Sequence, residues 1–158
     1  MRFDTRGAVG LVASAALVLL SACGGGSGGS GARNMRAVLT DDGCTYQGDE
    51  EPDAGALTVD VENQSSVDGA FALAGIAEGA TIDDLQKYMN EERQRHQQGG
   101  QLRGPPAFYS QVVRVGVAAG TSSQLPADLE AGQYALMCLN DDPPIWRVYL
   151  AGQLDVTP

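Results

Sequence analysis

Residues 132–139 have the sequence Gly-Gln-Tyr-Ala-Leu-Met-Cys-Leu, a short apolar run that begins at a glycine. From Tyr134 to Leu139 the apolar side chains fall on both alternating faces of an extended chain. This pattern is typical of a strand that is covered on both sides. We therefore expect residues 134–139 to form a central strand of a sheet.

Outward from this strand, short apolar segments recur at intervals of about ten residues, with turn residues between them. The clearest lies between Gly55 and Asn63, where Leu57, Val59 and Val61 alternate with polar neighbours, as in a half-buried strand. The pattern predicts an all-β fold, either a sandwich or a barrel. Its other strands are expected at 36–40, from 71 onward, and at 111–117, 121–129 and 146–156.

One stretch, about 81–98, has helical periodicity instead. Thr81 suits the N-cap, and acidic residues in the first turn suit the positive end of the helix dipole. Ile82, Leu85, Tyr88 and Met89 share one face, and Glu91 and Arg95 are spaced i, i+4 on the exposed side. Two roles remain open for this inserted helix. It is either a lid over an edge or end of the sandwich or a docking surface for a partner.

The amino-terminal segment has the features of an export signal. Arg2 and Arg6 precede an apolar run that is too short to span a bilayer as a helix. The run ends in Leu20-Ser21-Ala22-Cys23, which resembles the lipobox of bacterial lipoproteins. This resemblance implies that residues 1–22 are a signal peptide and that Cys23 is lipidated, with palmitate among the expected acyl groups. The alternatives are an ordinary signal cut after Ala22, or an uncleaved anchor.

The domain organisation follows from that signal. Residues 23–34 would be the lipidated cysteine and a Gly/Ser-rich tether, and residues 35–158 the folded domain. A flexible tether of this kind has a root-mean-square reach of roughly 18 Å. We expect the domain to sit on the extracytoplasmic face of the cell membrane, anchored by its lipid.

Two cysteines remain once Cys23 carries a lipid. In an exported protein, a pair such as Cys44 and Cys138 is more often a structural disulfide than two free thiols. Such a disulfide would close a long loop, which stabilises a fold by roughly 4 to 5 kcal/mol in chain-entropy estimates.

The carboxyl-terminal third resembles the end of a cupredoxin domain, the family of the blue copper proteins. Residues 132–138 match its G-x-Y-x-F-x-C strand in part, and residues 150–156 match its closing strand. Residues 59–63 run through a loop to residues 71–73, the region where the family usually has its first copper histidine. The resemblance implies a Greek-key β-sandwich of cupredoxin-like type.

The copper ligands of that family are mostly missing. Cys138 matches the thiolate, but the position of the first histidine falls near Asp68 or Gly69, and Leu150 occupies the methionine position. A blue copper site requires two imidazoles, and the chain has a single histidine, His96. A disulfide at Cys138 would also remove the thiolate. We therefore expect no metal site and no cofactor.

Charge and composition exclude other classes of function. With 20 acidic against 10 basic side chains, the net charge of -10 disfavours nucleic acid as a partner. His96 lies in a polar helix end, so we expect neither a catalytic triad nor an enzyme.

The function that remains is a non-catalytic binding or interaction module, tethered to a membrane by its lipid. Its partner would be an envelope protein or a small ligand. The candidate ligand loops lie at one end of the sandwich and include Asp68, Asp141, Asp142 and Trp146. The alternative is a copper-binding electron-transfer or copper-handling protein with atypical ligands.

Overall fold

The computed structural model describes residues 35–140 and 147–158. In this part of the chain, eight strands and one helix follow one another. The expected signal peptide, Cys23 and the tether lie outside the described residues, as do Asp141, Asp142 and Trp146. The elements are β1 (Met35–Leu39), β2 (Cys44–Gln47), β3 (Gly55–Asn63), β4 (Gly69–Ile76), α1 (Ile82–Gln97), β5 (Tyr109–Val117), β6 (Ser122–Leu129), β7 (Gly132–Asn140) and β8 (Arg147–Val156).

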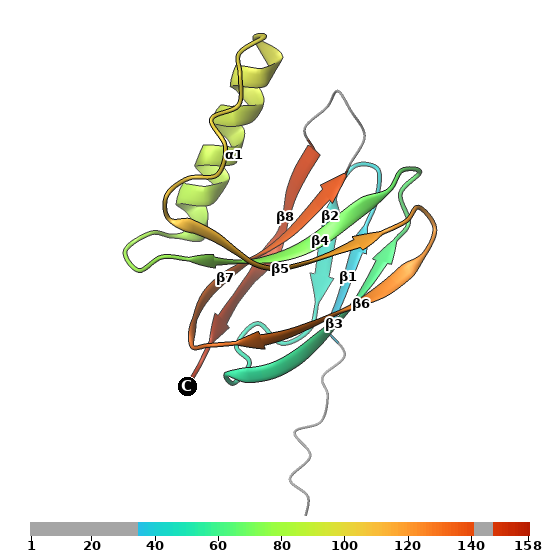
Figure 1. Cartoon of the computed structure of the whole chain (residues 1–158), viewed down its shortest axis with the longest axis vertical. Helices are drawn as coiled ribbons and strands as arrows, with labels where there is room; N and C mark the ends of the chain where they lie inside the picture. The colour runs from blue at the N-terminus through green and yellow to red at the C-terminus, as the bar shows by residue number, and fades with distance from the viewer. Residues whose placement is uncertain (1–34, 141–146) are drawn as a thin grey trace, which may run out of the picture. The chain divides into compact units, whose positions relative to one another are not determined.

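The strands form two four-stranded sheets, ordered β2-β1-β3-β6 and β5-β4-β7-β8 (Figure 1). The β1 and β3 strands pair in parallel, and the other neighbours are antiparallel. The arrangement is the cupredoxin-like β-sandwich with one inserted helix that the sequence predicts. The expected central strand is confirmed, because β7 pairs with β4 on one side and with β8 on the other.

The main core lies between the two sheets. Alternate residues of each strand point into it, among them Val59 and Val61 of β3, and Phe71 and Leu73 of β4. All four side chains are almost fully buried. The period-2 pattern of the sequence therefore identified the inward face correctly.

A disulfide joins the two sheets. It links Cys44 on β2, an edge strand of the first sheet, to Cys138 on β7, a central strand of the second. The two Cα atoms are 5.9 Å apart, a usual separation for a disulfide. The predicted pairing is confirmed.

A second apolar cluster lies on the outer face of the β5-β4-β7-β8 sheet, where α1 packs. Leu85 and Met89 of the helix contact a patch of this face that includes Ala74, Met137 and Val148. The helix therefore covers part of a sheet face, rather than an edge or end of the sandwich (Figure 1).

The ends of α1 follow from local chemistry. Thr81 is the N-cap, as expected. Its hydroxyl accepts from the Asp84 backbone N–H, and the Asp84 carboxylate accepts from the Thr81 backbone N–H. At the other end, Gly99 takes a φ of 77°, a left-handed conformation that favours glycine after a helix. In the described part of the chain, no helix combines the length and apolarity that a membrane crossing requires.

Two strands carry an extra residue. In the β4–β5 pair the register shifts so that Val112 is skipped, and this side chain is exposed. In the β7–β8 pair, Leu136 is opposite Gly152 while Met137 is opposite Leu150, so Ala151 is the extra residue. Such bulges exchange the inward and outward faces of a strand.

Candidate functional site

A groove of about 300 Å³ lies between α1 and the outer face of the second sheet, and we refer to it as the α1 groove. Leu85, Tyr88 and Met89 form its helical wall. Its floor consists of outward-facing residues of β7 and β8, namely Met137, Leu139 and Val148. Most of the lining is apolar, as in sites that bind small molecules.

The remaining wall comes from residues 102–106, which we call the return segment because it brings the chain from α1 back to β5. Leu102 is exposed at its start, and Pro105 and Pro106 restrict its backbone. Gly104 has a φ of 87°, where a side chain would be strained. The return segment therefore follows a constrained path along the groove.

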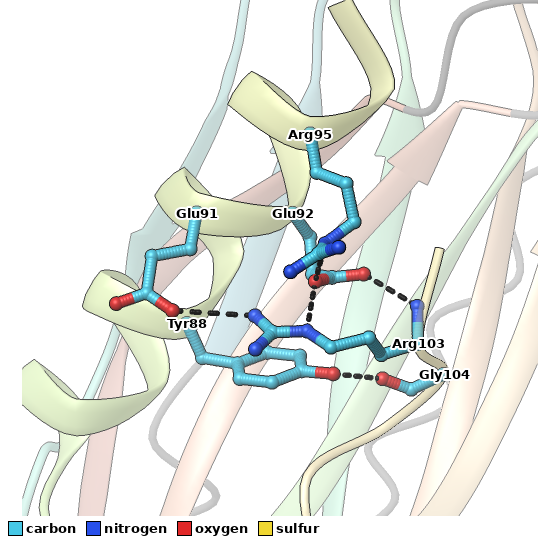
Figure 2. A network of polar contacts seen from close by, with 6 residues as sticks. All are labelled: Tyr88, Glu91, Glu92, Arg95, Arg103 and Gly104. Carbon is cyan, nitrogen blue, oxygen red and sulfur yellow. Dashed lines mark hydrogen bonds and ion pairs between the residues drawn. The ribbon is translucent and has the colours of Figure 1, made fainter. Parts of the chain in front are cut away.

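A buried carboxylate attaches the return segment to the helix (Figure 2). Glu92 is only 1% exposed. Its oxygens accept hydrogen bonds from the backbone N–H of Arg103, at 2.7 Å, and from the Arg103 guanidinium. Arg95 lies 3.5 Å from the same carboxylate. The hydrogen bond from the Arg103 backbone holds the pKa of Glu92 below its ordinary value, against the opposing effect of desolvation.

Three further contacts complete this attachment. The Arg103 guanidinium also pairs with Glu91 at 3.2 Å, and it lies 4.7 Å from the centre of the Tyr88 ring in a cation–π contact. The Tyr88 hydroxyl donates to the carbonyl oxygen of Gly104 (Figure 2). The return segment is thus fixed to α1 through both its backbone and its side chains.

This network differs from the surface pair expected in the sequence. Glu91 and Arg95 were expected as i, i+4 neighbours on the exposed side of the helix. Instead Glu91 pairs with Arg103, and Arg95 pairs with Glu92. Glu92 is on the buried stripe, where a carboxylate must be paired and hydrogen-bonded, and Arg95 and Arg103 supply its partners.

A third arginine lies beside the groove. The half-buried Arg93 donates from Nη2 to the backbone oxygen of Val148, at 3.3 Å, and from Nη1 to Oδ1 of Asn90, at 3.0 Å. Among the described residues, no carboxylate forms an ion pair with it. A positive charge therefore lies beside Val148, on the β8 side of the groove.

The groove also contains a partly buried phenol. Tyr109, at the start of β5, lines the groove, and burial raises the pKa of its hydroxyl. Gln111 adds an amide from the same strand. The polar side chains that line the groove are few, namely Glu92, Tyr109 and Gln111 besides Tyr88, as in ligand sites where such groups fix orientation.

The loop end of the sandwich, where the sequence places its candidate ligand loops, is different. Asn63 is fully buried, and its amide donates to the carbonyl oxygens of Val67 and Val117, both at 2.9 Å. Its Oδ1 accepts from the backbone and the hydroxyl of Ser65. Asp68, the described member of the predicted set, accepts from the Ala119 backbone N–H at 3.0 Å.

Two further polar groups at this end have different environments. The carboxylate of Asp41 accepts from the backbone and the hydroxyl of Ser66, and these bonds lower the pKa of Asp41. In the described region, Oδ1 of Asn140 is buried with no hydrogen-bond partner. Most of these polar side chains therefore form hydrogen bonds that hold the loops in place.

The residues present do not fit a blue copper site. Cys138, at the thiolate position, is bonded to Cys44, so it has no free thiolate to offer. The single histidine, His96, is in the last turn of α1. Within residues 35–140 and 147–158, no three His, Cys, Asp or Glu side chains form a group that could hold a metal ion.

The sequence therefore predicted the helix and the strand that line the α1 groove, but it did not predict the groove itself. It predicted the apolar helix face with Leu85 and Met89, and the apolar strand that supplies Met137. It missed Glu92 and Arg103. The available signal was spacing, because Glu92 follows Leu85 and Met89 at positions i+7 and i+3, on the same buried stripe.

A scan against protein-family models finds no match for this chain, and a search of curated proteins finds none either. Among solved structures, the chain is similar to dithionite-reduced auracyanin from the photosynthetic bacterium Roseiflexus castenholzii. The sequence identity is 18% and the TM-score 0.39, over 77% of this chain and 95% of that one. It is also similar to an azurin (Az-iso2) from the methylotroph Methylomonas sp. strain J. Here the identity is 12% and the TM-score 0.41, over 78% of this chain and 96% of that one.

Proposed function

We propose that this chain is a non-catalytic binding module, held at the extracytoplasmic face of a membrane by a lipid on Cys23, and that it binds a small apolar ligand in the α1 groove. The observation that carries the proposal is the groove itself, an apolar hollow of about 300 Å³ between an inserted helix and an apolar sheet face. This volume is at the lower end of the range for small-molecule sites.

The structure of the groove supports binding of a ligand rather than simple packing of the helix. The return segment is fixed by hydrogen bonds to Glu92 and Tyr88, so one wall of the hollow is held in place. A preformed wall lowers the entropy that a ligand must overcome on binding. The helix therefore acts as part of a site, and not only as a cover for the sheet.

The alternative, a copper protein with atypical ligands, would need a thiolate that the Cys44–Cys138 disulfide removes. Adding Cu(II) to the oxidised domain is expected to produce no intense thiolate-to-copper absorption in the visible range. Such a band would contradict the non-metal part of the proposal.

Binding is tested by titrating the domain with 1-octanol, a neutral apolar probe, and following the methyl NMR signals of Met89 and Met137. We expect saturable shifts at these two methionines. Leu139→Trp fills the floor of the groove and is expected to abolish the shifts. Val112→Trp is the matched control, because Val112 is exposed on β5 and is not among the residues that line the groove. Saturable binding that survives Leu139→Trp would contradict the assignment.

The membrane anchor is tested separately with the full chain. In a bacterial host, labelled palmitate is expected to enter the wild type, and Cys23→Ala is expected to remove the label. Equal labelling of Cys23→Ala and the wild type would contradict lipid attachment at this residue.

A further inference from the structure

We infer that the ligand of the α1 groove is a small single-chain anionic amphiphile, with its apolar chain between α1 and the sheet and its anionic head at Arg93. This inference rests on the proposed function and specifies the chemistry of its ligand. Three features carry it: the lining, the size of the groove and the charge at its margin.

The lining suits a flexible hydrocarbon chain. Met89 of the helix and Met137 of the sheet both line the groove, and Leu85 and Val148 extend the apolar surface. Unbranched thioether side chains adapt to chains of different shape better than branched ones. A rigid polar ligand would leave these surfaces without a matching partner.

The size of the groove favours one short chain. About 300 Å³ is at the lower limit of small-molecule sites. A two-chain phospholipid would therefore exceed it, and we commit to a monomeric single-chain ligand.

The charge at the margin favours an anion. Arg93 donates to the backbone oxygen of Val148, a residue of the groove wall, and no described carboxylate forms an ion pair with it. The neighbouring Arg95 and Arg103 share Glu91 and Glu92. Among the described residues here, three arginines therefore lie near two carboxylates.

This local excess of positive charge is notable because the whole chain carries a net charge of -10. An anionic ligand would be repelled over most of the surface, while Arg93 offers a guanidinium that can form charge-assisted hydrogen bonds to a carboxylate. A cationic amphiphile would instead be attracted to most of the surface and repelled by Arg93 at the groove. The sign of the ligand's charge is thus the most direct test.

The experiment uses octanoate, decanoate, 1-decanol and decylammonium, each below its solubility limit and micelle concentration, and measures affinity by calorimetry. Each added methylene is expected to tighten binding about fourfold, so decanoate, with two more methylenes, should bind about fifteenfold more tightly than octanoate. Decanoate should also bind on the order of tenfold more tightly than decylammonium.

Two variants locate the head group. Arg93→Gln is expected to abolish the preference for decanoate over decylammonium, while the affinity for 1-decanol remains within about twofold of that of the wild type. Arg36→Gln is the matched control, since Arg36 is an arginine on β1 that pairs with Glu62 far from the groove residues. It should leave all four affinities unchanged.

The outcomes separate the inference from the proposed function. Equal affinity for decanoate and decylammonium, or a charge preference that survives Arg93→Gln, would overturn the inference and leave an apolar groove. Binding to vesicles of anionic phospholipid without binding to monomeric decanoate would also overturn it, in favour of a membrane surface. No binding of any of the four probes would overturn the proposed function itself.

Discussion

Reduction of the Cys44–Cys138 disulfide should greatly lower the free energy of unfolding. The two cysteines are 94 residues apart in sequence, so the cross-link closes a loop of about 95 residues in the unfolded chain. The chain-entropy relation gives about 4.7 kcal/mol of stabilisation for a loop of this length at 25 °C. Cys138 is fully buried in the core, so we expect reduction to break the cross-link with little loss of apolar contact.

The assay is urea unfolding of the oxidised and reduced wild type, followed by circular dichroism. With a slope of about 2 kcal/mol per molar urea, the midpoint should fall by about 2 M on reduction. The variant Cys44→Ala/Cys138→Ala should fall further, because it also leaves a cavity at Cys138. A midpoint shift below about 0.5 M would refute the argument, since the cross-link would then place little restriction on the unfolded chain.

Other predictions concern Glu92, which attaches the return segment to α1, the loop end of the sandwich, and the half-buried phenol of Tyr46. Because the folded pKa of Glu92 is lowered, its stabilisation is present above its ordinary value of 4.5 and is lost as the pH falls below it. Glu92→Gln should therefore lower the Tm at pH 7 by several degrees and flatten its decline in acid, and an unchanged acid decline would contradict this. Gly69→Ala should cost about 1 to 3 kcal/mol in urea unfolding, because the new Cβ would lie 2.9 Å from the carbonyl oxygen of Leu139; a neutral effect would contradict the close contact. Burial, with Asp49 and Glu50 nearby, raises the pKa of Tyr46 to about 12, so the domain should lose stability between about pH 10 and 12, and Tyr46→Phe should lose less. Ultraviolet titration that placed every tyrosine near pH 10 would contradict this shift.

Much of the fold could be predicted because successive side chains of a strand point to opposite faces of its sheet. On β3, the alternation of Val59 and Val61 with polar residues agrees with the structure. On β7, the apolar run agrees with a strand covered by the first sheet on one face and by α1 on the other. The β2 strand was missed because Cys44–Gln47 is four residues long, too short for alternation to be evident. Its position depends on the pairing with β1 and on the disulfide, which are contacts distant in sequence.

The candidate site was less predictable. Helical spacing marks the apolar face of α1, but the groove exists only because the return segment passes along that face. Its path depends on the hydrogen bonds of Arg103 to Glu92, across a chain reversal at Gly99. The hydrophobic pattern of a single segment carries no information on where the chain goes after such a reversal. The candidate ligand loops were predicted from the family resemblance. Of their residues, Asp68 uses its carboxylate within the loop end of the sandwich, where it accepts from the Ala119 backbone N–H.

The extra residue at Ala151 has a consequence for how this protein can vary. Before it, Val148 and Leu150 belong to the cluster beneath α1; after it, Leu154 and Val156 belong to the core between the sheets. A single strand thus supplies two separate apolar environments. Substitutions in the first half of β8 should therefore change the packing beneath α1, and with it the ligand preference proposed for the α1 groove, while the core between the sheets is preserved. The two environments can thus vary independently along one strand.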